Sequence, residues 1–310
     1  MKKSWFYMLC TLATLGAMSV CAASTILYPV VVNGRWGFVN KSGETVINPQ
    51  FDRAGGFAEG LAPVRMGRWG YVDASGKMQI NPQFDKADVF SEGLAAVKLG
   101  GGPDPLNPYP YDPRPFSPYG GGGRYGYISL DGKYAINPQF EDAGTFSGGL
   151  APVRMGGRWG FVDKTGKIVI NPQFERAQQF SEGLAGIRMG GKWGFVDKTG
   201  KMTINSQFDE VGIFVKGLAP ARQGKHWGYI DSTGKFVINP QFDEAAAFSE
   251  DLAPVRQSGH WGFVDKSGKF VINPQFDEAA PFADGLARVK TGGRYGYIND
   301  SGKYVWNPSK

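Results

Sequence analysis

Cysteine and histidine are almost absent from this sequence of 310 residues. The two cysteines, Cys10 and Cys21, both lie near the N-terminus, and the two histidines, His226 and His260, are 34 positions apart. Loss of the N-terminal segment would leave no cysteine, which excludes disulfides and thiol chemistry. Two histidines alone are a poor ligand set for zinc. We therefore expect neither a metal nor a cofactor.

Long apolar runs are also missing, with one exception at the N-terminus. Two lysines precede the uncharged run Trp5–Val20, and the small residues Ala22 and Ala23 follow it. This order is typical of a secretory signal peptide, and the 16 uncharged residues are fewer than the roughly 20 that span a bilayer. We predict a signal peptide over residues 1–23, cleaved near Ala22 or Ala23. A membrane anchor or a lipidated Cys21 is the alternative. The mature chain should have no membrane span and should be periplasmic or extracellular.

A strong charge of one sign and known catalytic motifs are absent too. The formal charge of +6 includes the two N-terminal lysines, so the mature chain carries +4. That charge is too weak and too evenly spread to indicate a nucleic-acid partner. The sequence has no nucleophile elbow, no phosphate-binding loop before a helix, no metalloprotease helix and no calcium loop. We predict that the protein is not an enzyme.

The chain does contain one short unit, copied in tandem. An aromatic residue followed by glycine, then by Phe or Tyr and by Val or Ile, recurs eight times. These repeat aromatics are Trp36, Trp69, Tyr125, Trp159, Trp193, Trp227, Trp261 and Tyr295. The spacing is 34 residues from Tyr125 onward, 33 for the first step and 56 between Trp69 and Tyr125. Such a period predicts repeats that stack on one another, spanning residues 24–310.

Each repeat should contain three short strands joined by two hairpins. Residues 150–171 show the pattern, with segments rich in Val, Ile, Phe and Trp and with glycine in both turns. The first strand carries a proline in five copies, which predicts an edge strand. The fold class is all-β. We expect eight three-stranded antiparallel meanders stacked in a curved solenoid, with a closed propeller-like toroid as the alternative.

Packing between the copies can be predicted from the same pattern. Both faces of each meander carry apolar residues, so neighbouring repeats should cover both faces. The glycine after each aromatic should let a neighbouring ring or backbone approach, and the repeat aromatics should form an internal spine. In the connection between copies, Phe242 and Phe248 should anchor the chain to the core, while Asp243 and Glu244 face solvent.

The repeated motif resembles that of a known family. Lys192–Lys201 reads Lys-Trp-Gly-Phe-Val-Asp-Lys-Thr-Gly-Lys, and sister copies continue with Ile-Asn-Pro-Gln-Phe-Asp and Phe-Ser-Glu-Gly-Leu-Ala-Pro-Val-Arg. This resembles the bacterial WG-repeat family, also called KWG repeats, over nearly the whole mature chain. The resemblance implies a β-rich exported repeat protein without general enzymatic activity and without a defined ligand. Tyr125 and Tyr295 depart from it by replacing tryptophan.

The irregular step is produced by an insertion at residues 99–123. It contains seven prolines between glycine-rich ends, a composition that favours extended backbone. It is either a tolerated loop or a recognition arm. The candidate partner-binding residues are Tyr109, Tyr111, Arg114, Phe116 and Tyr119.

A row of basic residues precedes the repeat aromatics and could bind an anionic polymer. Its members are Arg35, Arg68, Arg124, Arg158, Lys192, His226, His260 and Arg294. The aspartates that follow in the same strand should largely neutralise them. These aspartates are Asp73, Asp163, Asp197, Asp231 and Asp265.

The sequence predicts an exported, non-catalytic repeat protein that acts as a protein–protein interaction or scaffold module. The alternative is a carbohydrate or cell-wall polysaccharide binder that stacks exposed aromatics on sugar rings. The partner is expected to be a protein or a cell-envelope polysaccharide.

Overall fold

The computed structural model describes residues 27–40, 43–100, 122–283 and 285–309. Regular structure in these ranges consists of β-strands, which form eight small antiparallel sheets, the first with three strands and the others with four. We number the sheets 1 to 8 along the chain. Their strands are called the inner strand, strand A, strand B and strand C, in chain order. In the described ranges no helix is long and apolar enough to cross a membrane.

The strand bounds repeat closely from sheet to sheet. The A strands are β1 (Tyr28–Val32), β5 (Leu61–Met66), β9 (Leu94–Leu99), β13 (Leu150–Met155), β17 (Leu184–Met189), β21 (Ala219–Gln223), β25 (Ala253–Gln257) and β29 (Leu286–Thr291). The B strands are β2 (Arg35–Val39), β6 (Arg68–Asp73), β10 (Arg124–Ser129), β14 (Arg158–Asp163), β18 (Lys192–Asp197), β22 (His226–Ile230), β26 (His260–Val264) and β30 (Arg294–Asn299). The C strands are β3 (Thr45–Phe51), β7 (Met78–Phe84), β11 (Tyr134–Phe140), β15 (Ile168–Phe174), β19 (Met202–Phe208), β23 (Phe236–Phe242), β27 (Phe270–Phe276) and β31 (Tyr304–Ser309). The inner strands are β4 (Arg53–Ala54), β8 (Lys86–Ala87), β12 (Asp142–Ala143), β16 (Arg176–Ser181), β20 (Glu210–Val211), β24 (Glu244–Ala245) and β28 (Glu278–Ala279).

The inner strands correct two expectations from the sequence. Each sheet after the first has four strands rather than three, because part of the connection between copies pairs with strand A. Strand A is therefore an edge strand in sheet 1 only, and not in sheets 2 to 8. In sheet 2, Ala54 pairs with Val64, and the carbonyl of Pro63 accepts a hydrogen bond from the Gly55 amide at 2.8 Å. The proline is tolerated because its carbonyl still takes part in the sheet.

Strand C explains why glycine follows each repeat aromatic. The strand runs on through Asn-Pro-Gln-Phe and bulges there, so that Trp159 pairs with Phe174 and Phe161 with Ile170. The bulge brings backbone against strand B. A Cβ on Gly160 would lie 2.4 Å from the Ile170 carbonyl oxygen, which no side chain can avoid. The predicted close approach is confirmed, and the approaching group is backbone.

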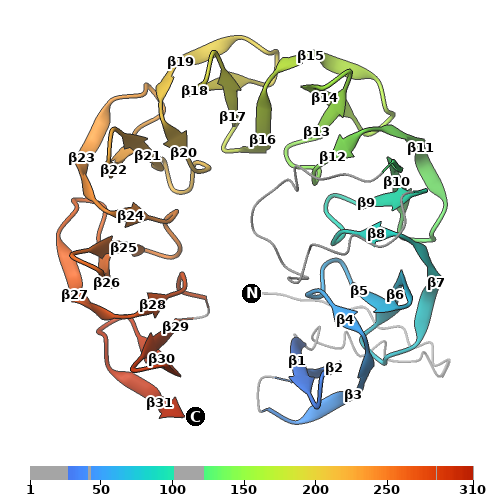
Figure 1. Ribbon diagram of the computed structural model, residues 1–310, viewed down its shortest axis with the longest axis horizontal. Helices are drawn as coiled ribbons and strands as arrows, with labels where there is room; N and C mark the ends of the chain where they lie inside the picture. Colours follow the sequence, from blue (N-terminus) through green and yellow to red (C-terminus); the bar gives the residue numbers. More distant parts are fainter. Residues whose placement is uncertain (1–26, 41–42, 101–121, 284, 310) are drawn as a thin grey trace, which may run out of the picture.

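The sheets are arranged around a common centre, like the blades of a propeller (Figure 1). The inner strands lie nearest the centre and the C strands form the outer edge. The arrangement corresponds to the propeller-like alternative, and the expected solenoid of three-stranded meanders was wrong. The strand pattern fixes each sheet, but the rotation from one sheet to the next depends on how their apolar faces fit together.

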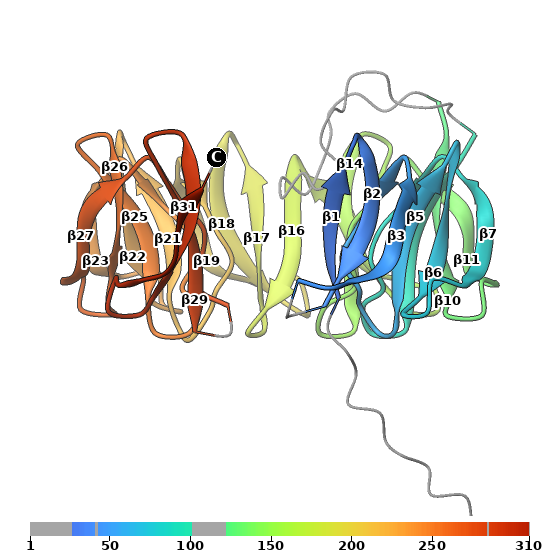
Figure 2. The same cartoon turned by 90° about the horizontal axis from the view of Figure 1, so that it is seen from below.

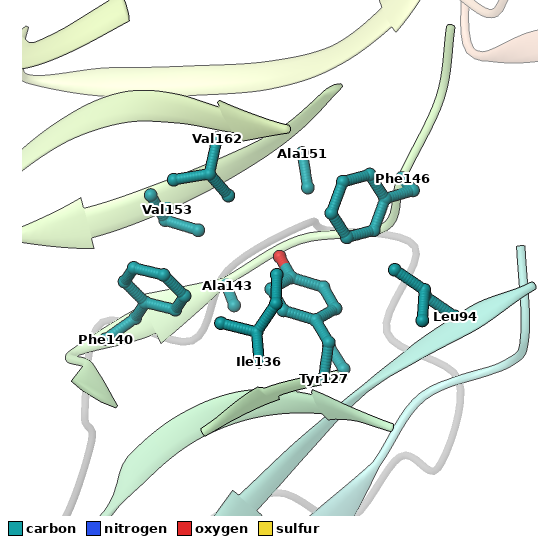
Figure 3. Packing of buried hydrophobic residues seen from close by; sticks show 10 residues of the cluster. Leu94, Tyr127, Ile136, Phe140, Ala143, Phe146, Ala151, Val153 and Val162 are labelled. Atoms are coloured by element: carbon teal, nitrogen blue, oxygen red, sulfur yellow. The ribbon is translucent and has the colours of Figure 1, made fainter. Parts of the chain in front are cut away.

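Seven apolar clusters, one between each pair of consecutive sheets, hold the array together. Between sheets 3 and 4, Tyr127, Ile136 and Phe140 pack against residues of the next sheet (Figure 3). The rings of Tyr127 and Phe146 have centroids 4.7 Å apart. Burial of each such ring contributes about 2–3 kcal/mol. Phe242 and Phe248 are 1% and 2% exposed, so their predicted anchoring is confirmed.

The first and last sheets each keep one apolar face in solvent. Tyr297 and Trp306 of sheet 8 are 40% and 49% exposed, whereas their counterparts in sheet 7, Phe263 and Ile272, are 0% and 3% exposed. In sheet 1, Val31 is 51% exposed. Figure 2 shows these two sheets separated at the ends of the array. Neighbours cover both faces of the interior sheets only, so the expectation of full coverage fails at the ends.

The outer edge is also less covered than the sequence pattern suggests. On strand C of sheet 4, Ile170 is buried, but Ile168 and Val169 are 38% and 42% exposed. The equivalent Val237 is 52% exposed. Neighbouring sheets contact the inward-facing side of strand C, so the apolar residue at its outer rim remains in contact with water.

The ring of sheets has two faces. Strand A runs from the turn after the inner strand to the turn before strand B, so these two turns lie at opposite ends of every sheet. We call the side with the turns between strands A and B the A–B face. The opposite side, the B–C face, carries the hairpins between strands B and C together with the turns that precede strand A (Figure 2).

Candidate interaction surfaces

The repeat aromatics lie at the start of strand B, at the edge of the apolar clusters. Trp159 is 4% exposed and Tyr295 is 38% exposed; the other six are half-buried. In each copy the residue opposite the aromatic on strand A is basic or aliphatic, as with Arg154 opposite Trp159. Ring contacts between successive copies involve the residue two positions later: Phe195, for example, lies 4.8 Å from Phe214. Most of the repeat aromatics therefore offer only part of a ring to a ligand.

The basic row before these aromatics lies on the A–B face, and its acidic partners differ from the predicted ones. Several of the cations pair with the acidic residue that follows strand C, as in Arg68 with Asp85 at 3.6 Å and Lys192 with Asp209 at 2.5 Å. Arg35 pairs in the same way with Asp52. The predicted neutralisation by the strand B aspartates was wrong.

The strand B aspartates instead hold the hairpins of the B–C face. Asp163 accepts hydrogen bonds from the Thr165 hydroxyl at 2.6 Å and from the amides of Thr165 and Lys167 at 2.9 and 3.1 Å. The Thr165 hydroxyl, followed by these amides, lowers the pKa of the Asp163 carboxyl against the opposing effect of desolvation. These aspartates recur because the turn recurs. Sequence alternation placed them in the correct strand, but it could not show that they bend back to their own turn.

The insertion joins strands A and B of sheet 3 on the A–B face, between Leu99 and Arg124. Its candidate partner-binding residues lie outside the described ranges. These residues are Tyr109, Tyr111, Arg114, Phe116 and Tyr119.

His226 and His260 are both exposed at the start of strand B in sheets 6 and 7. A nitrogen of His226 lies 4.0 Å from a carboxylate oxygen of Asp243. Over the residues that the structure describes, no three His, Cys, Asp or Glu side chains are grouped so that they could hold a metal ion.

Charge on the two innermost strands is distributed unevenly around the ring. The first residue of each inner strand pairs with a basic residue of strand A. In sheets 2, 3 and 5 both members are cationic, and we call these the inner cation pairs: Arg53 with Arg65, Lys86 with Lys98, and Arg176 with Arg188. In sheets 6, 7 and 8 the inner residue is a glutamate that pairs with the base, at 3.3, 2.7 and 2.8 Å.

The arginine pairs of sheets 2 and 5 are only partly neutralised, whereas Lys98 of sheet 3 is buried, at 4% exposure. Arg188 lies 3.8 Å from Glu175, and the Nε of Arg65 donates to the Gly67 carbonyl. Within the described part of the chain, Arg53 and Arg176 have no carboxylate within 4.0 Å. Like charges opposite one another destabilise a sheet. Their presence in three sheets therefore indicates that something other than stability maintains them.

Two acidic residues break the repeat pattern beside these cations. Asp88 is exposed where the other copies have Gly, Ala or Gln, and Asp142 is half-buried at the start of the inner strand of sheet 4. Desolvation raises the pKa of the Asp142 carboxyl to about 6, although the Ala143 amide and nearby cations oppose the shift. Desolvation, with the negative charges of Asp88 and Asp142, raises the pKa of Tyr127. The Tyr127 hydroxyl donates to the Gly144 carbonyl at 2.7 Å.

A series of carboxylates links the turns before strand A on the B–C face, near the centre of the ring. In sheets 2 to 6 this turn has two residues of positive φ, such as Glu59 at 51° and Gly60 at 86°, which is the type I′ hairpin geometry. The glutamate of one copy accepts hydrogen bonds from the turn amides of the next. Glu92 accepts from Gly148 and Gly149 at 2.6 and 3.0 Å.

Similar bonds join other copies: Glu59 to the Gly93 amide, Glu182 to the amides of Lys216 and Gly217, and Glu250 to the Gly285 amide. We call these bonds the turn carboxylate series. The sequence shows a glutamate at this position in four copies, with Gly148, Lys216 and Asp284 in the others, but sequence reasoning missed the series. The positive charges of the inner strands were missed as well, although departures from the repeat at each position would have revealed them.

Comparison with known proteins agrees with this geometry. The architecture places the chain among all-β repeat proteins with propeller-like blades. The family model for a WG containing repeat matches at residues 36–68, 69–102, 125–159, 159–193, 193–225, 227–259 and 261–295. The chain belongs to this family, and the predicted resemblance is confirmed. No curated protein matches the chain.

Two solved structures share the fold at low sequence identity. One is described as the crystal structure of the eukaryotic initiation factor, with a TM-score of 0.59 and 10% identity, covering 92% of this chain and 85% of the other. The second is the dihydro-heme d1 dehydrogenase NirN in complex with DHE, with a TM-score of 0.55 and 11% identity, covering 92% and 74%. At such identities these similarities show the fold alone.

Proposed function

We propose that this protein is an exported, non-catalytic interaction module that binds an acidic protein partner. A propeller-like array of WG repeats is, in general, the architecture of an interaction module rather than of a catalyst. The observation that carries the proposal is the set of inner cation pairs, since sheets 2, 3 and 5 have two cations where sheets 6, 7 and 8 have a neutral pair. This asymmetry has a cost in stability and is not required by the repeat.

The location of these charges supports binding rather than packing. They lie on the two innermost strands, close to the A–B face, which is also the face where the insertion is attached, between Leu99 and Arg124. A rigid scaffold that presents charged side chains and a long loop on one face is typical of a recognition surface. Export remains part of the proposal and rests on the N-terminal sequence pattern.

The experiment compares two charge-reversal variants with the same change in net charge. One carries Arg53→Glu and Arg176→Glu. The other carries Lys77→Glu and Lys269→Glu, which alter exposed residues of the B–C face in sheets 2 and 7. Proteins captured by the tagged chain from the cell envelope or the culture medium are identified by mass spectrometry.

We expect an acidic partner that is lost with the first variant, retained with the second and released as salt is raised. Equal capture by the two variants would contradict the proposal. A companion chain in which a short turn replaces residues 101–122 tests the insertion separately. If that chain captures the same partner with the same affinity, the insertion is not the recognition element.

Carbohydrate binding is the weaker proposal, because sugar stacking needs an accessible ring face. Only Tyr295 among the repeat aromatics is exposed, and it lies in the last sheet. Iodide quenching of tryptophan fluorescence tests this alternative directly. Ready quenching that is relieved by cell-wall polysaccharide would favour it over a protein partner.

A further inference from the structure

The turn carboxylate series is interrupted between sheets 4 and 5, and the interruption leaves a complete set of donors. In the preceding step, the carboxylate of Glu92 is held by three groups: the amides of Gly148 and Gly149 and the ammonium of Lys164, whose Nζ lies 3.3 Å from a carboxylate oxygen. Desolvation would raise the pKa of Glu92, but these donors outweigh it and lower the pKa. The three groups therefore stabilise an ionised carboxylate.

One repeat further on, the same three donors are present without the glutamate. The amides are those of Glu182 and Gly183, and the ammonium is that of Lys198. The residue that should supply the carboxylate is Gly148, with the same left-handed backbone, φ 62° against 54° at Glu92. Neither turn amide has a backbone acceptor and Lys198 has no ion pair, within the described residues.

The position of Lys198 shows where a carboxylate would arrive. Its Nζ lies 2.8 Å from the point that a Cβ on Gly148 would occupy, so the ammonium covers the place where the glutamate side chain begins in the sister copies. The Glu182 side chain does not fill this place, because its carboxylate is directed to the next turn, at the amides of Lys216 and Gly217.

The other interruption of the series differs. Lys216 replaces glutamate in sheet 6, and its Nζ lies 3.1 Å from Asp251 in the following turn. There the protein supplies its own counter-ion. At that step Lys266 stands at the position of Lys198, and it too has no ion pair within the described ranges. The two steps differ in the residue that replaces glutamate: Lys216 brings a second ammonium to the turn, whereas Gly148 has no side chain and leaves the place of the glutamate side chain free.

We propose that the amides of Glu182 and Gly183, with the ammonium of Lys198, form a binding site for a glutamate side chain presented by a partner protein. The choice of a carboxylate follows from the sister copies, in which turn amides hold the carboxylates of Glu59, Glu92, Glu182 and Glu250, and in the Glu92 step an ammonium joins them. This inference rests on the proposed function, because it specifies the chemistry of the partner. Since the site lies on the B–C face near the centre of the ring, a segment of the partner would extend over that face.

The test uses the full chain labelled with ¹⁵N and titrated with N-acetylglutamate N-methylamide, an analogue of a glutamate residue. The Gly183 amide resonance should move and saturate, since it gains a charged acceptor. The Gly149 amide is the internal control. It already bonds to Glu92 and should not move. A Gly183 resonance that does not respond would overturn the proposal.

Two variants keep the result interpretable. Gly148→Glu restores the carboxylate of the sister copies, so its Gly183 resonance should be shifted without ligand and should no longer titrate. Lys198→Met should weaken binding about tenfold, the factor that a charge-assisted hydrogen bond typically supplies. If Gly148→Glu still titrates like the natural chain, the ligand binds elsewhere and the site is refuted.

Two further probes decide the ligand class. Inorganic phosphate that saturates Gly183 at a lower concentration than the analogue would replace the carboxylate assignment. Tighter binding of glucuronate would favour an acidic polysaccharide and overturn the protein assignment. The titration needs no natural partner. If the analogue titrates Gly183 but no acidic partner is captured, the proposed function is contradicted and the carboxylate site still stands.

Discussion

Phe263 and Tyr297 offer the sharpest test of how the sheets pack. They occupy the same position of strand B in sheets 7 and 8, but Phe263 is 0% exposed and Tyr297 is 40% exposed. Phe263 lies in the cluster between the two sheets, with its ring centroid 4.9 Å from that of Phe282. Tyr297 lies beside Trp306 on the face of sheet 8 that no other described sheet covers. The same substitution should therefore have unequal effects.

The magnitudes follow from burial. Replacement of a fully buried phenylalanine by alanine costs about 3–5 kcal/mol, since the surrounding sheets cannot close the cavity completely. Tyr297→Ala should cost about 1–2 kcal/mol, because less apolar surface is removed from water at that position. The midpoints of the two ranges differ by about 2.5 kcal/mol, which is above the error of the method.

Urea unfolding followed by circular dichroism measures both free energies, and comparable m-values establish that the same structure unfolds. Amide exchange in sheets 7 and 8 checks whether the end of the array unfolds separately, as repeat proteins can. Equal losses for the two variants would show that sheet 8 is covered by another surface, such as sheet 1. A small loss for Phe263→Ala would refute the packing between sheets 7 and 8.

Other consequences concern single residues. Burial raises the pKa of Asp142 to about 6, so the folded chain holds this proton more tightly than the unfolded chain. Stability should therefore fall as the pH rises from about 4 to 6. The Asp142→Asn variant should lack this part of the pH dependence when urea midpoints are measured. Gly160→Ala should lower the free energy of unfolding by more than about 3 kcal/mol or prevent folding. Gly191 has open space around the position of a Cβ but a positive φ, so Gly191→Ala should lower it by about 1 kcal/mol. Similar thermal midpoints for the two variants would contradict this reasoning. Tyr127→Phe should cost about 1 kcal/mol, because the Gly144 carbonyl loses its donor; an unchanged unfolding free energy would show that water replaces the hydroxyl.

The period and the three longer strands of each copy could be predicted because they depend on local patterns. Alternation, turn glycines and the Trp-Gly motif act within one repeat, and the burial of Phe242 and Phe248 follows from their apolar character. The inner strand could not be predicted in the same way. Two residues such as Arg53–Ala54 are too few to show alternation, and they are extended only because strand A lies beside them.

The ring and the charged sites depend on contacts between copies. Whether repeats follow a line or a circle is decided by small rotations at the seven apolar interfaces, which hydrophobic spacing does not encode. The partner of Arg68 could not be read from the strand pattern either, since Asp85 reaches it from the end of strand C. That Gly148 lacks a carboxylate found in other copies becomes clear only from the structure, in which Glu92 accepts hydrogen bonds from the turn amides of the next copy.

The insertion residues Tyr109, Tyr111, Arg114, Phe116 and Tyr119 remain predicted contacts. Their role is separable from that of the inner strands, because the insertion belongs to sheet 3 whereas the inner cation pairs also occur in sheets 2 and 5.

Site-specific photo-crosslinking tests most directly whether the inner strands form the binding surface. A benzophenone side chain replaces Gln179 on the inner strand of sheet 5 or, as the matched control, Val237, which is 52% exposed on the outer edge of sheet 6. Illumination of the producing cells should give one discrete cross-linked protein from position 179 and none from position 237. The same product from both positions, or a product from position 237 alone, would contradict the assignment of binding to the inner strands.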